Sequence, residues 1–78
     1  MLIGTYTAQY IGKTMCGFVK TNEYRIEIDK DEYGYQVEGK VNLTEEKSSK
    51  GYITYASEQS LRKNWIIDED VTQINNYE

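Results

Sequence analysis

Apolar and polar residues alternate with a period of two along much of this chain. In the clearest example, Tyr24, Ile26 and Ile28 alternate with Arg25 and Glu27. β-Branched and aromatic residues at this period predict strands with one buried face. The pattern predicts five short strands, over residues 2–10, 24–28, 33–43, 52–56 and 65–67.

Three features break this alternation. Gly39 lies inside the third predicted strand, where a glycine predicts a bulge or a sharp bend. Residues 44–50 contain no apolar side chain, which predicts a mobile loop with Gly51 as its hinge. The connection between the first two strands is expected to be a loop over residues 12–17, followed by Phe18 and Val19 as either a short strand or an apolar anchor.

One short helical turn is predicted immediately before the last strand. Ser57 offers a hydroxyl that can cap the free backbone N–H groups of this turn. Glu58 lies at its positive end and Arg62 at its negative end, and both placements are favourable. Asn64 is expected to end the turn in the left-handed conformation that asparagine tolerates.

Four large apolar residues around this turn are predicted to belong to the core: Tyr55, Leu61, Trp65 and Ile67. The alternative is that Trp65 and nearby tyrosines line a ligand groove, since aromatic side chains with one polar end suit wet surfaces. Both interpretations hold if Trp65 lies at the edge of the core.

The order of these elements predicts an all-β fold, namely a small five-stranded SH3-like barrel with one short helical turn before the last strand. A barrel has fewer exposed edges than a flat sheet. An OB-type barrel is the alternative, although that fold usually needs more chain and a longer helix. We expect one domain over residues 1–67 and an acidic, polar tail over residues 68–78. Free edges in so small a domain favour pairing into a homodimer.

Composition narrows the classes of function. The 78 residues carry a net charge of −4, which disfavours direct binding to nucleic acid or to anionic membranes. The chain has no apolar run long enough to span a bilayer and no signal peptide, so we expect a cytoplasmic protein. Its single cysteine, Cys16, cannot form an internal disulfide and is expected to be buried or half-buried.

Motifs for catalysis or metal binding are lacking. With no histidine and one cysteine, a nucleophile–histidine pair cannot form and a zinc site is not expected. Asp29-x-Asp31-x-x-Gly34 begins like a calcium loop, but Tyr33 and Lys40 occupy its fifth and twelfth positions, where oxygen ligands are needed. We therefore expect a protein without catalytic residues, metal or cofactor.

Two motifs resemble short proteins of unassigned function from phages and mobile elements of Gram-positive bacteria. The motifs are Gly17-Phe18 ahead of Tyr24-x-Ile26-x-Ile28, and Tyr55-x-Ser57-x-x-Ser60-Leu61-x-x-Asn64-Trp65. The similarity spans most of residues 2–67 and rests mainly on structural positions. It implies a small accessory protein that counters host defence, and it carries over no catalytic residue.

An acidic, tyrosine-rich surface is the candidate binding site. Residues 29–32 are all charged and predict a turn, and the acidic residues 68–70 can extend the same surface. The alternative is an ordinary solvated surface that keeps the protein soluble. The predicted partner contacts are Asp29, Asp31, Glu32, Tyr33 and Tyr35.

The leading hypothesis is a non-enzymatic, stoichiometric inhibitor of a host defence protein such as a CRISPR nuclease. In it, the carboxylates occupy a basic channel of the partner and the tyrosines supply contact area. A second hypothesis is sequestration of a nucleotide-like signal, with Arg25, Arg62 and Lys63 as the phosphate donors. A third is a structural or assembly protein of a phage particle.

Overall fold

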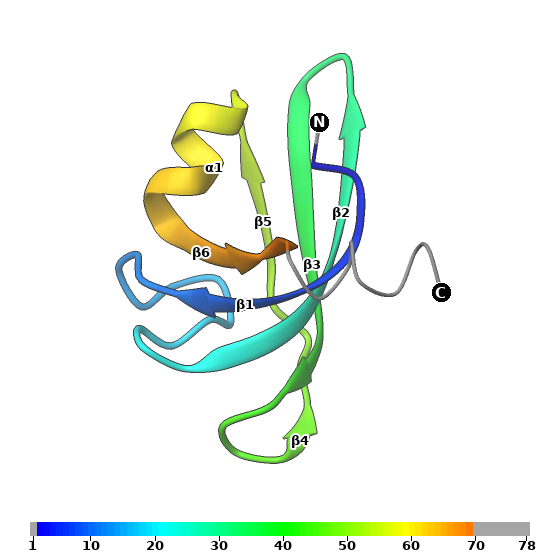
Figure 1. The fold of residues 1–78 in the computed structure, drawn as a ribbon. Coiled ribbons are helices and arrows are strands. Elements are labelled where there is room, and N and C mark those ends of the chain that lie inside the picture. The colour runs from blue at the N-terminus through cyan, green and yellow to red at the C-terminus, as the bar shows by residue number, and fades with distance from the viewer. Residues whose placement is uncertain (1, 70–78) are drawn as a thin grey trace.

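A computed structural model describes residues 2–69, which form a mostly antiparallel β-sheet with one short helix (Figure 1). In chain order the elements are β1 (Gly4–Tyr10), β2 (Glu23–Asp31), β3 (Gly34–Asn42), β4 (Lys47–Ser48), β5 (Tyr52–Tyr55), α1 (Glu58–Asn64) and β6 (Trp65–Asp68). The all-β prediction is confirmed. The sixth strand is β4, which forms within the polar stretch that the sequence analysis assigned to a loop. Most of the predicted tail lies outside the described residues.

The strands follow the order β4-β3-β2-β1-β6, and β5 also pairs with β3. Every pairing is antiparallel. Figure 1 shows β1 and β6 running across the direction of β3 and β5, with α1 linking β5 to β6. Within the part of the chain that the structure describes, no pairing joins β5 to β6, so the sheet is not closed.

The buried face predicted for residues 24–28 is confirmed. Tyr24, Ile26 and Ile28 of β2 lie in the core, while Arg25 between them is exposed. The buried apolar residues are Leu2, Tyr6, Ala8, Tyr10, Phe18, Tyr24, Ile26, Ile28, Tyr35, Val37, Tyr55, Leu61 and Trp65, with Ile53 and Ile67 packed against them. Six of these are tyrosines or tryptophan, which is how so short a chain fills its interior.

The predicted bulge in β3 is confirmed next to Gly39. Ile26 pairs with Gly39 and Arg25 pairs with Val41, so Lys40 is the extra residue. A bulge of this kind bends the strand and strengthens its twist.

The bulge also places a cation between two carboxylates that face each other across the strands. Glu27 pairs directly with Glu38, an arrangement that is unfavourable for like charges. The ammonium of Lys40 lies 3.3 Å from Glu38 and 3.4 Å from Glu27. These contacts, the one with Glu38 first, raise the pKa of Lys40.

The turn between β2 and β3 is shorter than predicted. The sequence analysis placed a charged turn over residues 29–32, but β2 continues to Asp31 and the turn contains only Glu32 and Tyr33. Charged side chains do not stop a strand whose outer face is solvated. Asp31 pairs with Gly34, and its Oδ1 accepts a hydrogen bond from the backbone N–H of Tyr33 at 2.8 Å.

Helix α1 begins as predicted and ends differently. The hydroxyl of Ser57 accepts a hydrogen bond from the Ser60 N–H at 3.1 Å, and Leu61 is fully buried. The left-handed exit at Asn64 is wrong, because the extended strand starts directly at Trp65, with φ −140°. Asn64 belongs to the helix, and its side chain donates to the Ser60 carbonyl at 2.8 Å. No helix in residues 2–69 is long and apolar enough to cross a membrane.

Cys16 is exposed, which contradicts the prediction that it is buried or half-buried. It lies in a tight turn with Gly17, where both residues have positive φ, +55° and +87°. Met15 and Phe18 close this turn by exchanging backbone hydrogen bonds of 2.9 and 3.0 Å. The turn directs Phe18 into the core and leaves Cys16 outside.

Trp65 belongs to the core, as the first of the two interpretations predicted. It is 2% exposed and lies 4.8 Å from Phe18 and 4.9 Å from Tyr10, measured between ring centroids. Its indole N–H donates to the Tyr55 hydroxyl at 3.1 Å. This hydrogen bond satisfies the one polar atom of a buried indole.

The burial of Tyr55 predicts how stability depends on alkaline pH. Burial raises the pKa of Tyr55 to about 12 from its ordinary value of 10.0. The folded protein therefore holds this proton more tightly than the unfolded chain does. The resulting stabilisation is fully present below pH 10 and is lost as the pH rises through 12. We expect the free energy of unfolding to fall more steeply with pH over this range in the wild type than in Tyr55→Phe.

Urea unfolding at neutral pH and between pH 10 and 12 tests this. At neutral pH, Tyr55→Phe is expected to lose about 1–3 kcal/mol, because the Trp65 N–H then lacks its acceptor. Tyr33→Phe is the matched control, since Tyr33 is 76% exposed. Parallel pH profiles for Tyr55→Phe and wild type would contradict the assignment of this dependence to Tyr55.

Candidate functional site

Four of the five predicted contacts lie together at the end of the β2–β3 hairpin. Asp29 and Asp31 project from the outer face of β2, and Glu32 and Tyr33 form the turn. All four are exposed, and Tyr33 is the most exposed large hydrophobic residue described. Figure 1 shows this turn at the opposite end of the molecule from β4. We call these four residues the acidic hairpin tip.

The structure separates Tyr35 from the acidic hairpin tip. Tyr35 is 6% exposed and faces the core side of the sheet. Its hydroxyl donates to Glu58 at 3.4 Å, and the ammonium of Lys30 lies 5.8 Å from its ring centroid. Tyr35 is therefore a packing residue in this structure, and the prediction that it contacts a partner beside Tyr33 does not fit its position.

The carboxylates of the tip are not neutralised within residues 2–69. No lysine or arginine there forms an ion pair with Asp29, Asp31 or Glu32, in contrast to Glu27 and Glu38, which share Lys40. Hydrogen bonds from the Tyr33 backbone and then from the Gln36 side chain lower the pKa of Asp31. Asp31 therefore keeps its negative charge at neutral pH.

Asp68 and Glu69 have neighbours other than the tip residues. Glu69 pairs with Arg62 at 3.1 Å. Asp68 lies on β6 beside Thr7, which in turn pairs with Arg25, four residues along β2 from Asp29. Asp70 lies outside the described residues.

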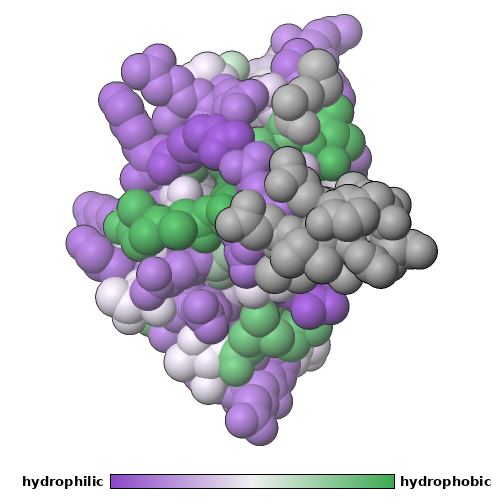
Figure 2. Space-filling view, viewed as in Figure 1, coloured by the Kyte–Doolittle hydropathy of each residue, from purple (hydrophilic) through white to green (hydrophobic). Residues whose placement is uncertain are grey.

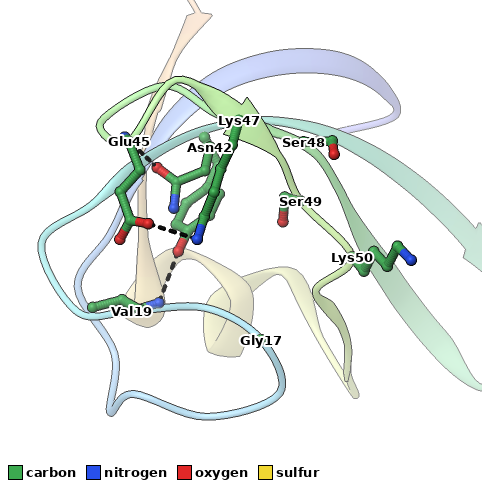
Figure 3. Close-up of a pocket in the computed structure, with 9 residues that line it drawn as sticks. Gly17, Val19, Asn42, Glu45, Lys47, Ser48, Ser49 and Lys50 are labelled. Carbon is green, nitrogen blue, oxygen red and sulfur yellow. Dashed lines mark hydrogen bonds and ion pairs between the residues drawn. The ribbon is translucent and has the colours of Figure 1, made fainter.

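A second candidate site lies at the other end of the molecule and was missed by the sequence analysis. It is a pocket of about 190 Å³ between the β1–β2 connection and the β3–β5 connection (Figure 3). We call it the lysine–serine pocket. Its walls are formed by Gly17, Val19, Tyr24, Asn42, Glu45, Lys47, Ser48, Ser49 and Lys50.

In this pocket the side-chain amide of Asn42 is hydrogen-bonded through its oxygen, while its nitrogen is free. The residue is 5% exposed, and its Oδ1 accepts a hydrogen bond from the Glu45 backbone N–H at 2.9 Å. A backbone N–H can only donate, so this bond determines which end of the amide faces Glu45. The nitrogen, Nδ2, lies on the other side, toward the space among the lining residues in Figure 3. It has no hydrogen-bond acceptor among residues 2–69.

The lysines of the pocket differ in their surroundings. Lys47 lies 2.8 Å from Glu45, and this contact lowers the pKa of Glu45 and raises that of Lys47. Lys50 is exposed and forms no ion pair within the part of the chain that the structure describes. The residues lining the pocket therefore include one lysine that is paired and one that forms no ion pair among the described residues.

A second hollow, of about 300 Å³, lies on the outer face of β1 and is lined by Thr7, Ala8, Gln9, Glu23, Ile66 and Asp68. Its exposed apolar side chain is Ile66, 57% exposed. On the face drawn in Figure 2, hydrophilic side chains predominate and hydrophobic ones form separate patches. Thr7, Gln9, Glu23 and Asp68 supply its polar side chains, and none of the lining residues is a cation.

The phosphate donors suggested by the sequence do not meet at one site. Arg62 is held between Glu58 and Glu69, at 2.8 and 3.1 Å. Neither Arg25 nor Lys63 lines the lysine–serine pocket. Within residues 2–69, no group of three or more metal-ligating side chains could hold a metal ion.

Comparison with known proteins does not assign either site. No family model, no curated protein and no solved structure matches this chain.

Proposed function

We propose that this chain is a non-enzymatic binding protein that acts stoichiometrically on a protein with a basic surface. The acidic hairpin tip carries the proposal, because it projects three carboxylates that no cation in residues 2–69 pairs with. Such a charge steers a basic partner and selects against acidic ones. The exposed ring of Tyr33 supplies contact area beside it.

Because of the resemblance to phage and mobile-element proteins, we propose that the partner is a host defence protein. A CRISPR nuclease is one example, since it holds nucleic acid in a positively charged channel. The hairpin tip would occupy that channel in the host cytoplasm and exclude the nucleic acid.

We further propose that the fold is an SH3-like barrel left open between β5 and β6. The order β6-β1-β2-β3-β5 and the position of α1 before the last strand support it. In this description β4 is a short addition to the β3–β5 connection. The outer edges of β5 and β6 would then be the places where a second copy of the chain could pair.

Reversing the charge of the tip is expected to weaken partner binding by about tenfold and to flatten its dependence on salt. The variant combines Asp29→Lys and Glu32→Lys with Asp31→Asn, which keeps an acceptor for the Tyr33 N–H. The partner is first captured from a Gram-positive host lysate with tagged protein and identified by mass spectrometry. Its affinity is then measured at several salt concentrations.

The control variant carries Glu23→Lys and Glu46→Lys, two exposed acidic residues away from the tip. Unchanged affinity in the tip variant, or an equal loss in the control, would reject the tip as the binding surface. Capture of no protein, with a small molecule released when the chain is denatured, would favour ligand sequestration. Stable self-association without any partner would favour a structural or assembly protein.

A further inference from the structure

We propose that the lysine–serine pocket binds the carboxylate group of a small organic acid. This site is distinct from the acidic hairpin tip and goes beyond the function proposed for it. The two sites lie at opposite ends of the molecule, one beside β4 and the other at the β2–β3 turn.

The free amide of Asn42 is the first observation that points to a ligand. Asn42 is more than nine-tenths buried, and Glu45 already occupies its oxygen. No side-chain nitrogen or oxygen described here is both fully buried and without a partner, so Nδ2 stays open to the pocket that it lines. A donor held in this way gains a hydrogen bond from an acceptor that enters, and the bond is stronger when the acceptor is charged.

Hydroxyl groups supply further donors around the same space. The Tyr24 hydroxyl accepts from the Val19 N–H at 2.9 Å, and the Ser49 hydroxyl accepts from the Gly51 N–H at 3.2 Å. Each hydroxyl has thereby used an acceptor position and retains its proton for donation. Ser48 adds a third hydroxyl to the wall. The pocket is thus rich in donors, which suits an oxygen anion.

The charge of the wall favours a carboxylate over a phosphate. Lys47 and Lys50 outweigh Glu45 by one positive charge, in a chain whose net charge is −4. A carboxylate carries one negative charge, whereas a phosphate monoester carries about −1.5 to −2 at neutral pH and would be repelled more by Glu45. The side chain of Val19 and the ring of Tyr24 provide an apolar wall for the remainder of the acid.

Nuclear magnetic resonance of the ¹⁵N-labelled chain tests the site directly. Sodium acetate and sodium butyrate are titrated at constant ionic strength, with sodium chloride as the control. We expect saturable shifts of the Asn42 side-chain amide and of the Gly17, Ser49 and Lys50 backbone amides. Butyrate should bind more tightly than acetate, because its hydrocarbon chain reaches the apolar wall. Saturation by inorganic phosphate but not by either carboxylate would overturn the choice of ligand, and saturation by none of them would overturn the site.

Asn42→Asp is the most informative variant. Aspartate keeps the acceptor for the Glu45 N–H but replaces the free donor with a negatively charged oxygen. We expect it to weaken carboxylate binding by at least about tenfold. Gln59→Glu is the matched control, since it makes the same chemical change at an exposed position of α1. A folded Asn42→Asp variant that binds butyrate like the wild type would overturn the proposal.

A second pair of variants keeps the test decisive if Asn42→Asp fails to fold. Lys50→Gln removes the unpaired cation of the pocket and should weaken butyrate binding by about threefold, a typical effect for an exposed charge. Lys63→Gln removes another exposed cation, on α1, and should leave binding unchanged. Equal affinities for these two variants would remove Lys50 from the site and overturn the proposed charge complementarity.

Discussion

Gly34→Ala is expected to destabilise the protein far more than Gly4→Ala, although the two glycines have similar backbone conformations. Their φ angles are +138° and +128°, a region that other residues rarely adopt. The strain of forcing alanine into this region, about 1–3 kcal/mol, should therefore be common to both variants. The two variants differ in the space that is available to the added Cβ atom.

At Gly34 an added Cβ would lie 2.2 Å from the carbonyl oxygen of Tyr55, whereas nothing lies within 4 Å at Gly4. That oxygen belongs to the backbone of β5, so it cannot move without displacing the strand that pairs with β3. Overpacking typically costs a further 1–3 kcal/mol or more. The sum approaches the total stability of about 5 kcal/mol at the low end for small domains.

Urea unfolding followed by circular dichroism measures both variants. Gly34→Ala should shift the midpoint strongly or populate the unfolded chain in buffer, and Gly4→Ala should remain folded with a moderate loss. Equal losses in the two variants would mean that β5 is not held against the β2–β3 turn as described.

The same hairpin shows what sequence patterns can and cannot predict. The buried faces of β2 and β3 followed from the alternation around Ile26 and Val37, because burial on one face imposes period two. The position of the turn could not be predicted in the same way. Asp29 and Lys30 are of residue types that are common in loops, but their backbone continues to pair with β3. Tyr35 shows the consequence: it shares the buried face of Val37, whereas Tyr33 lies in the turn, before β3 begins.

The lysine–serine pocket was beyond the reach of local patterns. Its walls come from residues 17–24 and 42–50, which meet only in the folded chain. The polar residues that line a pocket do not recur at a regular spacing along the sequence, so no periodic pattern identifies them. A local signal did exist at Asn42, since asparagine three residues before the amide that it caps is typical of a turn. Recognising that turn would have predicted order in residues 44–50, although not a binding site.

The second large effect on stability is expected where Phe18 packs against Gly51. Phe18 is fully buried, with its ring centroid 4.8 Å from that of Trp65 and 5.0 Å from that of Tyr24. A Cβ added at Gly51 would lie 2.6 Å from two atoms of the Phe18 ring. The ring therefore lies in a space that exists because residue 51 has no side chain. Phe18→Ala is expected to cost about 3–5 kcal/mol, and the exposed control Val19→Ala less than about 0.5 kcal/mol.

A double-mutant cycle tests the contact itself. Gly51→Ala alone should cost about 1–3 kcal/mol by crowding the ring. In a Phe18→Leu background the smaller side chain leaves room for the new methyl group, so the double variant should be about 1 kcal/mol more stable than the sum of the single losses predicts. Pairing Gly51→Ala with Ile28→Val, a substitution elsewhere in the core, should give additive losses. Additive losses for Phe18→Leu as well would contradict the contact.

This contact also links the core to the lysine–serine pocket. Gly17, at the pocket wall, is so close to Gly51 that an added Cβ would lie 2.8 Å from the Gly51 Cα. Phe18 follows Gly17 directly, so the ring holds the two sides of the pocket at a fixed separation. We therefore expect the Gly51→Ala variant to lose butyrate binding under conditions where circular dichroism shows it to be folded. Retained affinity in that folded variant would show that the pocket does not depend on the packing beneath it.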